Sequence, residues 1–136
     1  MTIDQAGIDF IKSFEGFSAS VYTDLAGKPT IGYGHRLKPS ESFPSPITEP
    51  EAESILATDL DPIDNAVSAL APQCNQNQHN ALCSFGYNLG YGALATMLAH
   101  GWVQVPTQML LWVYAGGAII EGLERRRAAE VALFNS

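Results

Sequence analysis

Apolar residues near the start of the chain recur at the spacing of an α-helix. Thr2 and Gln5 form a capping-box pattern ahead of them. The periodic apolar positions are Ile3, Ala6, Phe10, Ile11 and Phe14. Glycine is a frequent residue just past a helix end, so the pattern predicts a helix that stops at Glu15-Gly16.

The next residues have the composition of short β-strands instead of the apolar spacing of a helix. Residues 20–23 ("SVYT") and 30–33 ("TIGY") are rich in β-branched and aromatic residues. A short link containing Gly27 and Pro29 joins them, which predicts an antiparallel hairpin. Residues 38–46 are rich in proline and serine and are predicted to be a loop.

The remainder of the chain is predicted to be helical. Thr48 and Glu51 form a second capping box, and the helix that they open is expected to break or kink at Pro62 before continuing to Leu70. Further helices are predicted within 75–90, 93–101, 106–114 and 122–134. One hairpin among these helices predicts an α+β fold, mostly helical, with a small antiparallel sheet.

The length of 136 residues predicts one domain. Within it we expect two lobes. A hairpin lobe is predicted at about 16–60, and a helical lobe at about 61–136 together with the N-terminal helix.

Charge and hydropathy exclude several classes of partner. The net charge of −7 opposes binding to DNA or RNA phosphates, so we expect no nucleic-acid partner. The basic run Arg125–Arg127 is better explained by a solvated helix face or a local ion pair. No apolar run has the roughly 18 to 20 residues needed to span a membrane, and no signal peptide is visible. We therefore expect no stable membrane insertion, and either a cytosolic product or a secreted protein whose leader has been removed.

The two cysteines leave several possibilities open. If Cys74 and Cys83 shared one helix they would lie roughly 13 Å apart, too far for a disulfide. A bond requires Cys74 to precede the helix and fold back. His79 and Cys83 are four residues apart and share a helix face, as in a thiol–imidazole dyad or half of a metal site. A buried thiol is the favoured interpretation, because no third ligand lies nearby in the sequence, and we expect no metal.

Candidate catalytic chemistry is concentrated around the hairpin. Glu15 lies at the negative end of a helix dipole between Phe14 and Phe17, and both influences raise the pKa of a carboxyl group, as a general acid requires. Asp24 and Thr30 lie at the two ends of the hairpin link, so we expect them to face one another across the ladder. Two carboxylates beside a cleft are what glycoside hydrolysis requires. Ordinary surface positions would look the same, and spacing alone does not decide.

The motifs "FEG", "YTD" and "PTIGYGH" resemble those of the phage-type lysozymes, glycoside hydrolase family 24. The blocks "ITEPEAESIL", "NQNQHNALCSFGYNLGYGAL", "LLWVYAGG" and "GLERRRAAEVALF" resemble family blocks in the expected order, so the resemblance covers most of the chain. It implies a two-lobed lysozyme fold and a muramidase that cleaves the β-1,4 bond between N-acetylmuramic acid and N-acetylglucosamine with inversion.

The resemblance also implies roles for individual residues. Glu15 would be the general acid, and Asp24 with Thr30 would position or activate the attacking water. Arg126 is the expected partner of Glu15, although Arg125 or Arg127 is an alternative. The residues expected along the substrate cleft are Tyr33, His35, Asn88, Gly90 and Arg126. For His35 a structural role is equally consistent with the sequence.

The expected partner is bacterial peptidoglycan, acted on by a monomer without a cofactor. If phage-derived, the protein would stay in the host cytoplasm until it is released to the cell wall. The competing interpretation is a non-catalytic peptidoglycan-binding module of phage structural machinery. A thiol peptidase that uses His79 and Cys83 is a third possibility.

Overall fold

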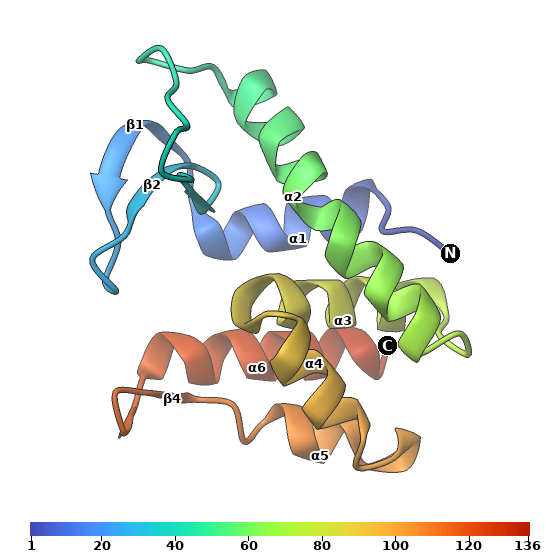
Figure 1. Cartoon of the computed structure of the whole chain (residues 1–136). Helices are drawn as coiled ribbons and strands as arrows, with labels where there is room; N and C mark the ends of the chain where they lie inside the picture. The colour runs from blue at the N-terminus through green and yellow to red at the C-terminus, as the bar shows by residue number, and fades with distance from the viewer. The chain divides into compact units, whose positions relative to one another are not determined.

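A computed structural model describes the whole chain, residues 1–136 (Figure 1). The helices are α1 (Gln5–Glu15), α2 (Glu49–Leu70), α3 (Gln76–Leu89), α4 (Tyr91–Leu98), the short 3-10 turn η1 (Trp102–Gln104), α5 (Val105–Met109) and α6 (Glu121–Phe134). The strands are β1 (Ser18–Thr23), β2 (Pro29–Gly32), β3 (His35–Arg36), β4 (Tyr114–Ala115) and β5 (Ala118–Ile119). None of the helices combines the length and the apolar character that a membrane span requires.

The chain forms two compact units. The hairpin unit comprises Asp9–Asp61, and the helical unit comprises Met1–Ile8 with Pro62–Ser136. Helices α1 and α2 each contribute residues to both units. The predicted α+β class is confirmed: the chain is mostly helical with small antiparallel sheets.

The hairpin unit is built on an antiparallel sheet in the order β1-β2-β3 (Figure 1). The predicted hairpin is therefore confirmed, and β3 extends it by a strand that the sequence did not reveal. Its core contains the fully buried Ile11, Ile31 and Ala52. Gly32 and Gly34 have positive φ values of 66° and 84°, which let the chain reverse between β2 and β3.

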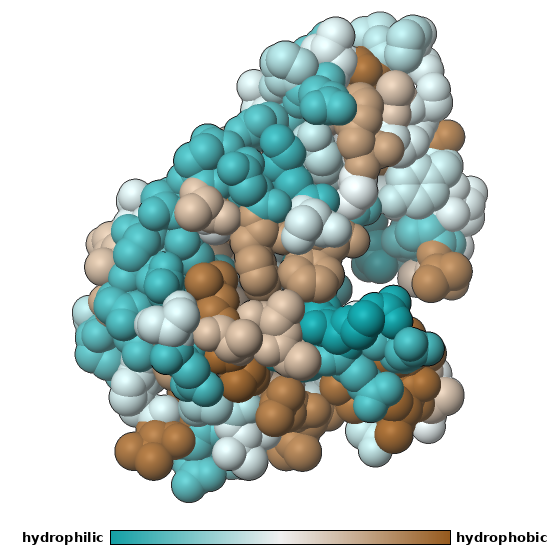
Figure 2. All heavy atoms as spheres, turned by 180° about the vertical axis from the view of Figure 1, so that it is seen from behind, coloured by the Kyte–Doolittle hydropathy of each residue, from teal (hydrophilic) through white to brown (hydrophobic).

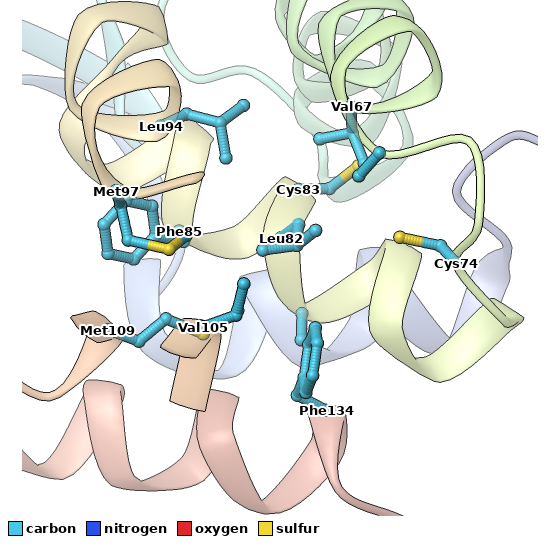
Figure 3. Close-up of a cluster of buried hydrophobic side chains, with 12 residues drawn as sticks. Val67, Cys74, Leu82, Cys83, Phe85, Leu94, Met97, Val105, Met109 and Phe134 are labelled. Carbon is cyan, nitrogen blue, oxygen red and sulfur yellow. The ribbon is translucent and has the colours of Figure 1, made fainter. Parts of the chain in front are cut away.

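The helical unit is organised around α3, which packs against α6 and α4 (Figures 1 and 3). Residues from five helices, α2 to α6, share its apolar core, among them Val67, Leu82, Phe85, Leu94, Met97, Met109 and Phe134. Helix α3 begins with a capping box in which the Asn75 side chain accepts from the Gln78 amide and the Gln78 side chain accepts from the Asn75 amide. The predicted helix over 75–90 is thus confirmed, with Gly90 as its C-cap.

Two details of the predicted helices are wrong. Helix α1 is capped by Asp4 rather than Thr2, because Asp4 Oδ1 accepts from the Gly7 amide at 3.0 Å. Helix α2 runs without a break through Pro62, although the proline has no N–H to donate to the Thr58 carbonyl. The predicted capping box at its start is confirmed, since Glu51 N lies 3.3 Å from Thr48 Oγ1 and Thr48 N lies 3.4 Å from Glu51 Oε1.

The segment after Pro106 also differs from its prediction. Helix α5 ends at Met109, and the following residues form the small β4–β5 hairpin around Gly116 and Gly117. Exposed apolar side chains gather here: Val103, Leu110, Leu111, Tyr114, Ile119 and Ile120. Figure 2 shows apolar atoms along the lower edge of its view, where Figure 1 places α5 and this hairpin. The apolar residues of the segment are thus divided, because Val105 and Met109 belong to the core while Val103 is exposed.

Candidate active site

Glu15 is the last residue of α1, and the backbone of the β2–β3 turn fixes the space around it. Gly16 follows with a φ of 68°, and its amide donates to the Lys12 carbonyl at 3.0 Å. A Cβ atom placed on Gly34 would lie 2.7 Å from Glu15 Oε1, closer than such atoms approach in proteins. A side chain at position 34 would be strained by the φ of 84° and would push the Glu15 carboxylate aside, so the glycine leaves room for it.

A hollow of about 300 Å³ opens beside this carboxylate. The residues that line it are Glu15, Gly16, Phe17, Ser18 and Tyr22. Phe17 and Tyr22 keep 36% and 41% of their surface exposed, so their rings are available to a ligand. A wall of carboxylate, hydroxyl and aromatic groups suits a sugar, which presents hydroxyl groups at its edge and C–H groups on its faces.

Asp24 is held in one orientation by three donors. Its Oδ1 accepts from the backbone amides of Ala26 at 2.9 Å and Lys28 at 2.8 Å, and its Oδ2 accepts from Arg36 Nε at 2.9 Å. The Lys28 amide, followed by the Arg36 guanidinium, lowers the pKa of Asp24 below its usual range. The carboxylate is therefore ionised at neutral pH, as a group that orients a water or stabilises positive charge must be.

The predicted pairing of Asp24 with Thr30 across the ladder is wrong. Tyr22 lies opposite Thr30, and Thr23 lies opposite Pro29. Asp24 follows the last pair, and its amide donates to the Lys28 carbonyl at 2.9 Å. Thr30 is 2% exposed, and its hydroxyl donates to the same carbonyl at 2.9 Å. The two residues thus share Lys28 as an anchor instead of facing one another.

The phenol of Tyr22 is affected by the negative charges of both Glu15 and Asp24. Burial is the main cause that raises the pKa of its phenol, and the negative charges of Glu15 and Asp24 raise it further. Tyr22 lines the hollow together with Glu15, and on the chain it lies two residues before Asp24. Arg36, which holds Asp24, was not predicted, because it lies on β3, a strand without a signal in the sequence.

Tyr33 and His35 have side chains that are almost entirely enclosed within the hairpin unit. Tyr33 is 6% exposed, with Lys12 Nζ 5.0 Å from its ring centre and the Phe17 ring 5.6 Å away. It supports Phe17, which lines the hollow. His35 is 7% exposed; its Nδ1 lies 2.6 Å from Asp59 Oδ2 and its Nε2 lies 2.7 Å from Glu41 Oε1. Both of its ring nitrogens are engaged, which favours the structural role of the two left open by the sequence.

The carboxylates around His35 predict a pH-dependent stability. Burial lowers the pKa of His35, but the hydrogen bonds to Glu41 and Asp59 outweigh it, and the net pKa is raised above 6.5. The stabilising interaction is therefore fully present below about pH 6.5, the pKa of histidine in an unfolded chain, and is lost as the pH rises through the folded-state pKa.

We expect the melting temperature of the wild type to exceed that of His35→Gln most at about pH 5.5 and progressively less toward about pH 9. The matched control is His100→Gln, since His100 is exposed, and it should follow the wild-type curve. A difference between wild type and His35→Gln that stays constant across this range would contradict the assignment.

In the helical unit, Arg126 and Arg127 are buried in an ion-pair cluster around Glu130, which is fully buried. Arg126 Nε lies 3.4 Å from Glu130 Oε2, and Arg127 Nε lies 2.7 Å from Glu130 Oε1. The Ser84 hydroxyl donates to Glu130 Oε2 at 2.5 Å. The local ion-pair interpretation of the arginine run is thus confirmed, and the solvated-face alternative holds only for Arg125.

Asn88 and Gly90 lie at the C-terminal end of α3. Asn88 Oδ1 accepts from Arg127 Nη2 at 2.5 Å, so the arginine fixes the orientation of this amide. Gly90 has a φ of 93°, and its amide donates to the Gly86 carbonyl at 2.7 Å. The predicted roles of Asn88, Gly90 and Arg126 in binding substrate stay predictions.

The thiol chemistry considered for Cys83 is not available to a substrate. Cys83 is 0% exposed, and burial raises the pKa of its thiol well above the usual range. Cys74 is also buried, which raises the pKa of its thiol to about 11. Both cysteines are free, and the buried-thiol interpretation is confirmed. No third ligand lies nearby in the sequence, but the fold brings Asp64 of α2 into contact with His79.

Residues 12–130 match the family model described as phage lysozyme. The chain is 40% identical to the endolysin of Bacillus phage PZA, aligning over 100% of this chain and 56% of that protein. It is 37% identical to the endolysin of Salmonella phage P22, over 100% of this chain and 99% of that protein. The structure resembles the endolysin from Escherichia coli O157:H7 phage FAHEc1, with a TM-score of 0.86 and 32% identity over 98% and 93% of the two chains.

Proposed function

The chain belongs to the phage lysozyme family, and on this premise we propose that it is a muramidase that hydrolyses bacterial peptidoglycan. The chain spans about half the length of its Bacillus phage relatives, 56% and 54%, and almost all of the P22 endolysin. The proposal therefore concerns the activity of these 136 residues, acting as one catalytic domain and as a monomer.

The observation that carries the proposal is the arrangement around the hollow of the hairpin unit. Glu15 and Tyr22 line the hollow, and Asp24, held by three donors, follows Tyr22 by two residues. We assign the bond as the β-1,4 linkage between N-acetylmuramic acid and N-acetylglucosamine. Glu15 donates a proton to the departing glycosidic oxygen, which Asp24 cannot do because it is ionised at neutral pH.

Water attacks the sugar from the opposite face in this mechanism. Asp24 orients the water and stabilises the positive charge that develops on the sugar ring. The Thr30 hydroxyl gives its hydrogen to the Lys28 carbonyl, so its oxygen lone pairs remain to accept a hydrogen bond from the water. A single displacement of this kind inverts the anomeric centre.

The alternative is a module that binds peptidoglycan without cutting it. The close fit of Gly34 against Glu15 and the three donors on Asp24 favour the enzyme, because a binding surface does not require two carboxylates in different, fixed environments.

In the cell, we propose that the protein stays in the host cytoplasm until it is released to the wall. Secretion is the alternative route.

Digestion of purified peptidoglycan, followed by mass spectrometry of the soluble fragments, tests the proposal. We expect fragments that end in a reducing N-acetylmuramic acid, since water adds across the broken bond. A binding module would release no fragments. A transglycosylase would leave anhydro ends, because the muramic acid itself supplies the attacking oxygen.

A further inference from the structure

A polar cluster lies within the apolar core of the helical unit. His79 and Cys83 are one turn apart on α3, and Asp64 of α2 meets them. His79 Nε2 lies 2.5 Å from Asp64 Oδ1, and Cys83 Sγ lies 3.9 Å from the same oxygen. One nitrogen, one sulfur and one oxygen ligand atom thus lie within 4.8 Å of one another, in the interior of the protein.

The proposed lysozyme chemistry does not account for this cluster. None of its three residues lines the hollow beside Glu15. His79 and Cys83 are 1% and 0% exposed, and their neighbours are the aliphatic and aromatic residues of the core. Burying an imidazole, a thiol and a carboxylate together costs free energy that aliphatic side chains at the same positions would not.

We propose that Asp64, His79 and Cys83 form a binding site for a divalent transition-metal ion, with Zn²⁺ as the preferred occupant. Thiolate, imidazole and carboxylate are the three ligand types that zinc takes in proteins. A set with one soft sulfur and one imidazole excludes Mg²⁺ and Ca²⁺, which prefer oxygen ligands throughout. The spacing of His79 and Cys83 directs both side chains to the same face of α3, as a shared ion requires.

Two of the distances between ligand atoms are within about 1 Å of those in a tetrahedral site. Zinc bonds of 2.0 to 2.3 Å imply ligand atoms roughly 3.3 to 3.6 Å apart. The distance of 3.9 Å between Cys83 and Asp64 needs to shorten only slightly, and the 2.5 Å between His79 and Asp64 has to lengthen. Small rotations of the carboxylate and the imidazole achieve both. The ion would bind the neutral imidazole of His79 at Nε2, with the ring's one hydrogen on Nδ1, and the Cys83 thiol would give its proton to solvent as the metal–sulfur bond forms.

Asp64 gives an ion access to the cluster from solvent, and a backbone amide orients its carboxylate. The side chain of Asp64 keeps 13% of its surface exposed, so the cluster meets solvent at this residue, and a water molecule there can fill the fourth position. The Ile3 amide donates to Asp64 Oδ1 at 3.0 Å, which orients the carboxylate as outer partners do in metal sites. Burial disfavours a lone thiolate at Cys83, and a cation removes that penalty.

A disulfide with Cys74 would compete with metal binding at Cys83. Cys74 precedes α3, and Figure 3 shows the sulfur atoms of Cys74 and Cys83 pointing toward one another in the core. Oxidation to a disulfide would remove Cys83 as a ligand. The site therefore has to be tested with both thiols reduced.

Cobalt substitution is the direct test, because Co²⁺ occupies zinc sites and its absorption spectrum depends on its ligands. The full chain, without a histidine tag, is reduced, freed of metal with a chelator and titrated with Co²⁺. We expect one Co²⁺ per chain, an intense near-ultraviolet thiolate-to-cobalt band, loss of that band when Zn²⁺ is added, and a higher melting temperature with either ion. Absence of the near-ultraviolet band in the wild type overturns the proposal, and this readout does not depend on any variant folding.

Variants assign the ligands. Cys83→Ser should abolish the thiolate band, and Asp64→Asn should weaken Co²⁺ binding by at least about tenfold. The control His100→Gln, on an exposed histidine of the same unit, should bind as the wild type does. A band that survives in Cys83→Ser, or is lost in His100→Gln, would show that the ion binds elsewhere and would overturn the assignment. Peptidoglycan hydrolysis is not part of the readout, so failure here leaves the proposed function intact.

Discussion

Replacing Glu15 with glutamine is expected to slow the clearing of a peptidoglycan suspension by about 10² to 10⁴-fold. Glutamine keeps the size and shape of the side chain and still fits against Gly34, but it has no proton to donate to the departing oxygen. The loss should appear in kcat, because proton donation occurs in the transition state and contributes little to binding the intact wall.

The matched control is Glu49→Gln, which makes the same chemical change at an exposed position near the start of α2. It should clear the suspension at the wild-type rate. Circular dichroism should show the wild-type helical content in both variants, so that a lower rate reports the chemistry and not the fold. Equal clearing by wild type and Glu15→Gln would remove Glu15 from the mechanism.

Replacing Glu130 with glutamine is expected to destabilise the protein by about 3 to 5 kcal/mol, the cost of leaving buried charges without their partner. Glu130 is 0% exposed and lies between Arg126 and Arg127, whose positive charges would remain in the core. For a chain of this length the loss corresponds to a fall in melting temperature of roughly 10 to 17 °C.

Glu124→Gln serves as the control for this variant, because Glu124 is an exposed glutamate on the same helix. Its melting temperature should stay within about 2 °C of the wild type. Thermal or urea unfolding monitored by circular dichroism provides the measurement. If Glu130→Gln were as stable as Glu124→Gln, the cluster would contribute no net stability.

Local signals in the sequence were sufficient to predict much of the hairpin unit. Gly16 ends α1 because a positive φ is available to glycine, and that single residue places Glu15 at the end of the helix. The β-branched and aromatic residues on each side of Gly27 specify the hairpin. The register could not be predicted, since a slip of two residues decides whether Thr30 lies opposite Asp24 or Tyr22.

Other features depend on contacts that no local pattern encodes. The two-residue strands β4 and β5 are too short to show a period, so the segment resembled a longer helix. Pro62 lies inside α2 because only one backbone hydrogen bond is lost there, within a helix of 22 residues. The contact of Asp64 with His79 joins residues 15 positions apart on different helices, which the sequence alone could not bring together.

The most direct test of the central claim is peptidoglycan digestion in water enriched in heavy oxygen, with mass spectrometry of the new ends. If Glu15 protonates the departing oxygen and Asp24 directs a water to the sugar, each new N-acetylmuramic acid end should be reducing and should carry one heavy oxygen from solvent. Anhydro ends without the label would contradict this account, because the muramic acid itself would then have displaced the leaving group without any water.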